Sequence, residues 1–170
     1  MIVSDSMCKY FPDLKNTDVQ AFGGLTTQRL KWKIEQGHFN LDQYCNIIIH
    51  VGTNDVFHIS SDIFYENMVS VVQEILRLNR ACKVILSSIL PRPVDYKFSD
   101  ILIREFNLKL ADYAVSHSDR VVYMPVCKSF YCRFGRPVFP LFLKTDRLHL
   151  NHADIQKFVH FIANFLAHLY

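Results

Sequence analysis

Glycine is scarce in this sequence, with five in 170 residues. Long apolar runs are also absent, and no stretch approaches the ~20 apolar residues that a membrane-spanning helix needs. The opening "MIVSDSM" lacks the charged leader, apolar core and small-residue cleavage site of a signal peptide. These absences predict a soluble protein without stable membrane insertion.

Cysteines are few and odd in number, which argues against a secreted disulfide framework. Cys45 and Cys82 lie in or beside apolar runs, as reduced, buried thiols do, so we expect a reducing, cytoplasmic location. Cys127 and Cys132 lack a second Cys/His pair at matching spacing, so neither a zinc site nor any other metal or cofactor is predicted.

Charge is nearly balanced, at +3, and the basic residues are scattered singly. Nucleic acid is therefore not the expected partner of this domain alone. The sequence leaves open whether the protein is a monomer or a homodimer.

Two hydrophobic periods alternate along the chain. Three short segments are rich in apolar, β-branched residues, as in strands buried on both faces of a parallel sheet: residues 45–51, 83–90 and 120–125. Helical spacing predicts a short helix that ends at Gly37 and three longer ones, over 64–78 with Ser61 or Asp62 as N-cap, over 100–116, and from 155 onward. We predict one α/β domain over residues 1–170, a three-layer α/β/α sandwich around a mostly parallel sheet. If "MIV" is the first strand, it starts abruptly, as if cut from a longer polypeptide.

Ligands of such sheets bind beyond the carboxyl ends of the strands, which directs attention to three segments. "SDSM" follows the first predicted strand, "GTND" follows the second, and "DRLH" precedes the last helix. Three of the five glycines lie in "FGGLTT" and "GTND", where backbone must approach something closely.

Asp146 and His149 stand three residues apart, a spacing at which a carboxylate can hold an imidazole as general base. The partner of such a pair is a serine at a strand end, and Ser6 is best placed. Backbone N–H groups of Ser6 and Gly24 and the Asn54 amide would stabilise an oxyanion. The motifs of α/β-hydrolases, P-loops and zinc proteases are absent, so acyl transfer is the leading chemistry.

These blocks, in this order, resemble the SGNH or GDSL-like hydrolases. "QAFGGLTTQRLKWKIEQG" followed by "IIIHVGTND" looks especially like the catalytic subunits of intracellular platelet-activating-factor acetylhydrolase. Similar domains occur in some animal retroelement reading frames. The resemblance implies a flavodoxin-like fold, a Ser6–His149–Asp146 triad and an oxyanion hole of Ser6, Gly24 and Asn54. Position 4 departs from it, with serine where the family usually has glycine.

The function expected is a serine esterase acting on a small acyl-ester or lipid-like substrate. The alternative is a weak or inactive SGNH-like module that contacts protein or nucleic acid within a larger polypeptide. Residues 126–145 show no clear periodicity but are rich in aromatic and basic residues. We expect Phe130, Arg133 and Arg136 to contact substrate, in a shallow pocket that prefers short acyl groups such as acetyl.

Simpler structural interpretations exist for most of these residues. Ser6 could be a turn residue, and Asp146 could cap the last helix. His149 could be a surface histidine. Asp55 is interpreted as structural, and His50 as a core or sheet histidine.

Overall fold

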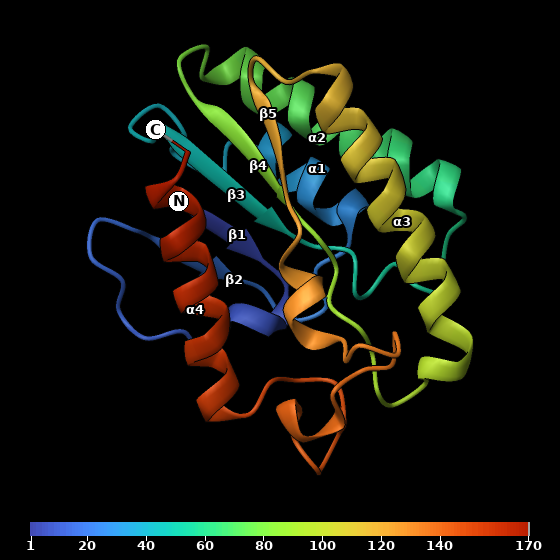
Figure 1. Cartoon of the computed structure of the whole chain (residues 1–170). Helices are drawn as coiled ribbons and strands as arrows, with labels where there is room; N and C mark the ends of the chain where they lie inside the picture. The colour runs from blue at the N-terminus through green and yellow to red at the C-terminus, as the bar shows by residue number, and fades with distance from the viewer. Residues whose placement is uncertain (170) are drawn as a thin grey trace.

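The computed structural model describes residues 1–169, which form one parallel sheet flanked by helices (Figure 1). The strands are β1 (Ile2–Ser4), β2 (Val19–Ala21), β3 (Asn46–His50), β4 (Lys83–Ser87) and β5 (Val121–Met124). Their order in the sheet is β2-β1-β3-β4-β5. The α-helices are α1 (Thr27–Glu35), α2 (Ser61–Leu78), α3 (Tyr96–Ser116) and α4 (His152–Ala167). Short 3-10 helices are η1 (Ser6–Cys8), η2 (Val126–Phe130) and η3 (Phe139–Leu141). The predicted α/β/α class is confirmed.

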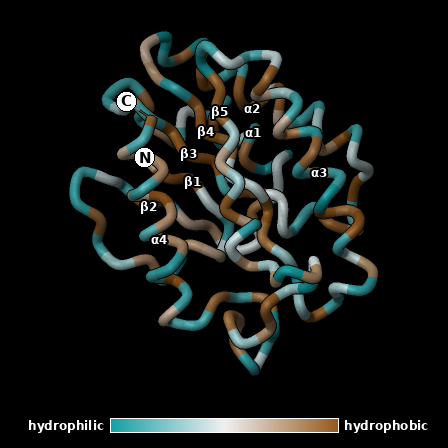
Figure 2. Tube along the Cα trace, in the orientation of Figure 1, coloured by the Kyte–Doolittle hydropathy of each residue, from teal (hydrophilic) through white to brown (hydrophobic). Residues whose placement is uncertain are grey.

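The two faces of the sheet are covered unequally. Helices α1, α2 and α3 pack on one face, where the rings of Phe64 and Phe106 stack at 4.2 Å. On the other face α4 packs with η1 and η2, and Phe158 contacts Phe130 edge-on. The hydrophobic colouring in Figure 2 follows the central strands between these layers. Right-handed crossovers explain the distribution, because the connections through α1, α2 and α3 all run in one direction across the sheet.

Helix boundaries follow their capping residues. The N-cap of α2 is Ser60, whose hydroxyl accepts from the Ile63 N–H, so the prediction of Ser61 or Asp62 was off by a residue or two. Gly37 has φ +69 just after α1, as the predicted helix end requires. The N-cap of α4 is Asn151, which leaves Asp146 outside the helix.

The carboxyl ends of β1 and β3 meet at the switch point of the sheet. From β1 the chain crosses to β2 on one side, and β3 lies on the other. Loops that leave such neighbouring strands diverge and open a crevice between them. Ser6 lies two residues after β1 and Asn54 lies four residues after β3, so the fold brings "SDSM" and "GTND" to the same edge of the sheet.

Candidate active site

Ser6, His149 and Asp146 form a continuous hydrogen-bonded chain. The His149 Nε2 atom lies 2.9 Å from Ser6 Oγ, and His149 Nδ1 lies 2.8 Å from Asp146 Oδ2. Ser6 begins η1 at the end of β1, whereas the other two residues lie in the turn before α4. The structure thus brings together the three residues that the sequence predicted. It also excludes the interpretations of Asp146 as a helix cap and His149 as an isolated surface residue.

The turn that carries Asp146 and His149 is held in shape by backbone contacts. Asp146 Oδ1 accepts from the N–H groups of Leu148, at 2.9 Å, and His149, at 3.1 Å, so its other oxygen faces the imidazole. Arg147 adopts φ +52, a left-handed conformation that few residues other than glycine take up. The Val94 N–H donates to the Arg147 carbonyl at 2.9 Å and fixes this strained residue from outside the turn.

Asp146 stays ionised at neutral pH. Partial burial raises its pKa, but hydrogen bonds from Leu148 and His149 outweigh that effect, and the pKa is lowered from its ordinary value. An ionised carboxylate on Nδ1 selects the tautomer with the proton on that nitrogen. The Nε2 lone pair then faces the Ser6 hydroxyl, as a general base requires.

Asn54 and Gly24 lie on adjoining loops. The Asn54 side-chain amide donates to the Leu25 carbonyl at 3.1 Å, which ties "GTND" to the loop that contains Gly24. Gly24 has φ +64, a backbone conformation that favours glycine. The loops of both predicted oxyanion-hole residues are therefore joined at one end of the sheet.

Gly52 is required by the close packing beneath this loop. Its φ is +138, and a Cβ atom at this position would lie 2.4 Å from Ile89 Cδ1. Ser4, in contrast, lies within β1 and pairs with Ala21 and His50. Its φ is not positive, so serine fits here without the backbone strain that the departure from glycine suggested.

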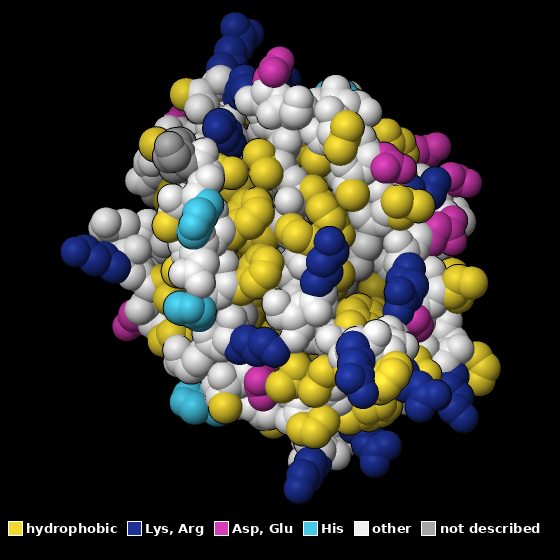
Figure 3. Space-filling model, in the orientation of Figure 1, with side chains coloured by type: hydrophobic (Ala, Val, Ile, Leu, Met, Phe, Trp, Pro, Cys, Tyr) yellow, Lys and Arg dark blue, Asp and Glu magenta, His cyan; other side chains and the backbone are white. Residues whose placement is uncertain are grey.

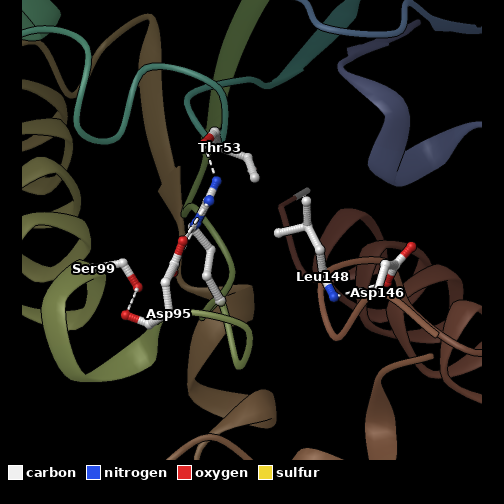
Figure 4. Close-up of polar contacts among 6 residues, drawn as sticks. Thr53, Asp95, Ser99, Asp146 and Leu148 are labelled. Carbon is white, nitrogen blue, oxygen red and sulfur yellow. Dashed lines mark hydrogen bonds and ion pairs between the residues drawn. The ribbon is translucent and has the colours of Figure 1, made fainter. Parts of the chain in front are cut away.

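Arg92 organises the site although the sequence analysis did not identify it. Its guanidinium donates to the Thr53 carbonyl at 2.7 Å and forms an ion pair with Asp95 at 2.6 Å. Figure 4 labels Thr53 and Asp95 and, separately from them, the hydrogen-bonded pair of Asp146 and Leu148. Thr53 directly precedes Asn54, so Arg92 anchors the "GTND" loop to the start of α3. A single arginine in "LPRPVD" has no spacing that would reveal this role.

The remaining predictions concern residues 126–145. Phe130 is fully buried between Phe142 and Phe158, and we do not retain it as a substrate-binding residue. Arg133 and Arg136 are exposed, and their contact with substrate stays a prediction. A cavity of about 820 Å³ lies instead along the following segment, which includes the Asp146–His149 turn. It is lined by Phe139, Pro140, Phe142, Leu143, Lys144, Arg147 and Asn151.

Asp55 and His50 are structural. Asp55 accepts from both the N–H and the hydroxyl of Thr27, which fixes the start of α1 to "GTND". His50 is buried, with Nδ1 2.9 Å from Ser87 Oγ, and burial lowers its pKa to about 4. Both interpretations from the sequence are confirmed, although the partner of Asp55 lies 28 residues away.

Across residues 1–169, no cluster of three or more His, Cys, Asp or Glu side chains is arranged to hold a metal ion. No helix in this range is long and apolar enough to cross a bilayer.

No protein-family model and no curated protein matches this sequence. Solved structures do match. One from Streptococcus pneumonia, described as a platelet activating factor, has a TM-score of 0.85 at 21% identity, covering 97% of this chain and 82% of the other. The fold is that of the GDSL-like hydrolases. A GDSL-like lipase from Bacteroides thetaiotaomicron has a TM-score of 0.75 at 18% identity, and the match covers 99% of this chain and 87% of the other. A carbohydrate esterase of family 3 from Talaromyces cellulolyticus has a TM-score of 0.71 at 16% identity, and the match covers 99% of this chain and 96% of the other.

A buried carboxylate adjoins the Ser6 position of this GDSL-like fold. Burial raises the pKa of Asp5 from its ordinary value of 3.8 to about 6, against the opposing effects of the Met7 N–H, the Thr53 hydroxyl and the nearby His149 side chain. The carboxylate oxygen Oδ1 accepts from the Met7 N–H at 3.0 Å and so shapes η1. The sequence showed Asp5 beside Ser6 but gave no sign of its burial.

We expect Asp5→Asn to change stability in a pH-dependent way. The pKa of Asp5 is higher in the folded state, so its contribution to stability is present at pH 4 and is lost as the pH rises through about 6. A shift of this size corresponds to about 3 kcal/mol. Urea unfolding at pH 4, 5, 6 and 7 should show the variant gaining stability relative to wild type as the pH rises. An unchanged difference between the two proteins would contradict the assignment.

Proposed function

We propose that this protein is a serine hydrolase of carboxylic esters. The observation that carries the proposal is the chain from Ser6 Oγ through His149 to Asp146, with successive distances of 2.9 and 2.8 Å. This arrangement suits nucleophilic attack, because the hydroxyl that attacks and the base that takes its proton must lie within hydrogen-bond reach of each other. The proposal is supported by the position of Ser6 after β1, because ligands of such parallel sheets bind beyond the carboxyl ends of the strands.

The reaction follows from the geometry in two steps. The Ser6 oxygen attacks the ester carbonyl while His149 Nε2 takes the serine proton, and Asp146 stabilises the resulting imidazolium. The oxyanion accepts from the Ser6 and Gly24 N–H groups and the Asn54 amide. His149 then gives the proton to the departing alcohol, which leaves an acyl-enzyme. Water, deprotonated by His149, releases the acid and restores Ser6.

The substrate class we propose is an ester with a short, acetyl-type acyl group. The leaving group would extend toward the cavity that Arg147, from the turn between Asp146 and His149, helps to line. The wall of this cavity combines Phe139 and Phe142 with the basic side chains of Lys144 and Arg147. This composition favours a leaving group with both apolar and anionic parts. Rates on p-nitrophenyl esters of increasing acyl length should be highest for the shortest.

A covalent probe tests the proposal most directly. A fluorophosphonate should label the wild-type protein at Ser6, and peptide mass spectrometry should locate the adduct there. Ser6→Ala should abolish labelling. Its free energy of unfolding should stay within about 0.5 kcal/mol of the wild-type value, because the side chain makes little packing contact. Ser129→Ala is a matched control that should keep full labelling.

Failure of this experiment would have a definite meaning. If the folded wild-type protein is not labelled, or if labelling survives Ser6→Ala, the chain is not an esterase with Ser6 as its nucleophile. A binding module with a GDSL-like fold would then be the better description.

A further inference from the structure

The outward face of α3 carries a stripe of exposed apolar side chains. Phe98, Ile101, Leu108 and Val115 are 72%, 72%, 61% and 78% exposed. The last three are spaced by seven residues, and Phe98 lies one turn before Ile101, so all four share one side of the helix. Single exposed apolar residues are ordinary on a protein surface, but a stripe of four along one helix marks an interaction site.

The stripe is opposite the buried face of its own helix. Ile103, Phe106 and Leu110 are buried against the sheet and α2, about half a helical turn away from the exposed residues. The stripe therefore contributes nothing to the core. In Figure 3 hydrophobic and charged side chains alternate along the flank of the molecule where Figure 1 shows α3.

One neighbouring turn widens the apolar surface. Arg104 donates to the Gly135 carbonyl at 2.9 Å and holds the turn that contains Phe134 against α3. Phe134 is 74% exposed. The candidate surface therefore consists of the α3 stripe and Phe134, with Arg104 between them.

We propose that a second copy of this chain packs antiparallel on the α3 stripe, about a twofold axis at Leu108. A twofold interface places residues equally far before and after the axis opposite each other. Ile101 then meets Val115 of the other copy, and Leu108 meets its own counterpart. This inference is independent of the proposed function, because the triad lies within one chain.

Charge complementarity selects the second copy and its direction. Arg104 and Asp112 are both exposed and lie four residues before and after Leu108. In the antiparallel arrangement each Arg104 is level with Asp112 of the other copy, within reach of its long side chain. Within its own chain Arg104 pairs with Asp100 at 2.7 Å through Nε, and the contact with Asp112 would add to that pair. A parallel arrangement would instead bring like charges together.

The size of the surface sets the expected affinity. Helix α3 has 21 residues, so the strip is about 30 Å long and 10–12 Å wide. Even with Phe134, this is less than the roughly 800 Å² per partner of a standard interface. We expect a dimer that dissociates on dilution, with a Kd of about micromolar order.

Sedimentation velocity on the whole chain over a concentration series should show a monomer–dimer equilibrium. Leu108→Lys should remain monomeric throughout, and circular dichroism should show an unchanged fold, since the side chain is exposed. Arg104→Glu and Asp112→Arg should each raise the Kd by about tenfold or more. The double variant restores opposite charges across the interface but not the Arg104 contact with Gly135, so it should recover part of the affinity. Arg77→Glu, an exposed arginine on α2, is the matched control and should leave the Kd unchanged.

Three results would overturn the proposal. If the wild-type protein stays monomeric at all concentrations, the α3 stripe does not bind a second copy of this chain. A dimer that persists in Leu108→Lys is formed elsewhere on the molecule. A double variant no better than either single variant excludes the antiparallel arrangement about Leu108.

Discussion

His149→Ala is expected to lower kcat/KM for p-nitrophenyl acetate by about 10⁴-fold or more, because no other group can take the Ser6 proton. The imidazole contacts both other triad members, at 2.9 and 2.8 Å, so its loss separates the nucleophile from the carboxylate. His152→Ala, an exposed histidine three residues later, is the matched control.

Asp146→Asn should cost about 10⁴-fold in kcat, the loss typical of an orienting carboxylate. The amide oxygen can still accept from Leu148 and His149 N–H groups, so the turn should keep its shape. The amide nitrogen, however, would face Nδ1 with a donor and favour the wrong imidazole tautomer. Full activity in both His149→Ala and Asp146→Asn would show that the turn is only structural.

Asn54→Ala is expected to lower kcat by about 10²–10³-fold with a much smaller change in KM, because an oxyanion donor acts mainly in the transition state. Fluorophosphonate labelling should decline less than turnover. Asn40 is an exposed asparagine that precedes β3, the strand that Asn54 follows. Asn40→Ala is the control and should have no effect. A rise in KM at constant kcat would show instead that Asn54 binds the substrate ground state.

Arg92 should act through the same loop. Its bond to the Thr53 carbonyl positions the residue next to Asn54, so Arg92→Ala should lower kcat by about tenfold in wild type and have little further effect in Asn54→Ala. Arg92→Lys keeps the charge but cannot bind Thr53 and Asp95 together, so only partial rescue is expected. Additive effects of Arg92 and Asn54 substitutions would exclude this coupling.

The alternation of apolar periods was sufficient to predict the sheet, because strands buried on both faces leave few alternatives to a parallel arrangement. Strand β2 was not predicted. Its three residues are only half-buried and resemble a loop in composition. The α3 helix begins at Tyr96 instead of residue 100, since its first turn carries exposed residues that break the apolar pattern.

The three residues of the proposed triad could be predicted because the chemistry of acyl transfer limits the residue types and because strand ends limit their positions. The residues that surround these three could not be predicted from the sequence. Phe130 and Phe139 look alike in the sequence, yet the first is in the core and the second is 43% exposed at a cavity. Which aromatic residue turns inward depends on η2 and η3, two short helices without a sequence period. Contacts such as Arg92 with Thr53 join positions 39 residues apart and leave no local signal.

The hydrogen bond between Ser6 and His149 joins residues 143 positions apart. Contacts of such long sequence separation form late in folding, because the intervening chain must first be ordered. A partly folded or partly synthesised chain therefore has the proposed nucleophile, Ser6, but not the proposed base, His149. Reactivity toward an acylating reagent becomes a measure of completed folding, and its appearance during refolding should lag behind the helical signal until α4 has docked on the sheet.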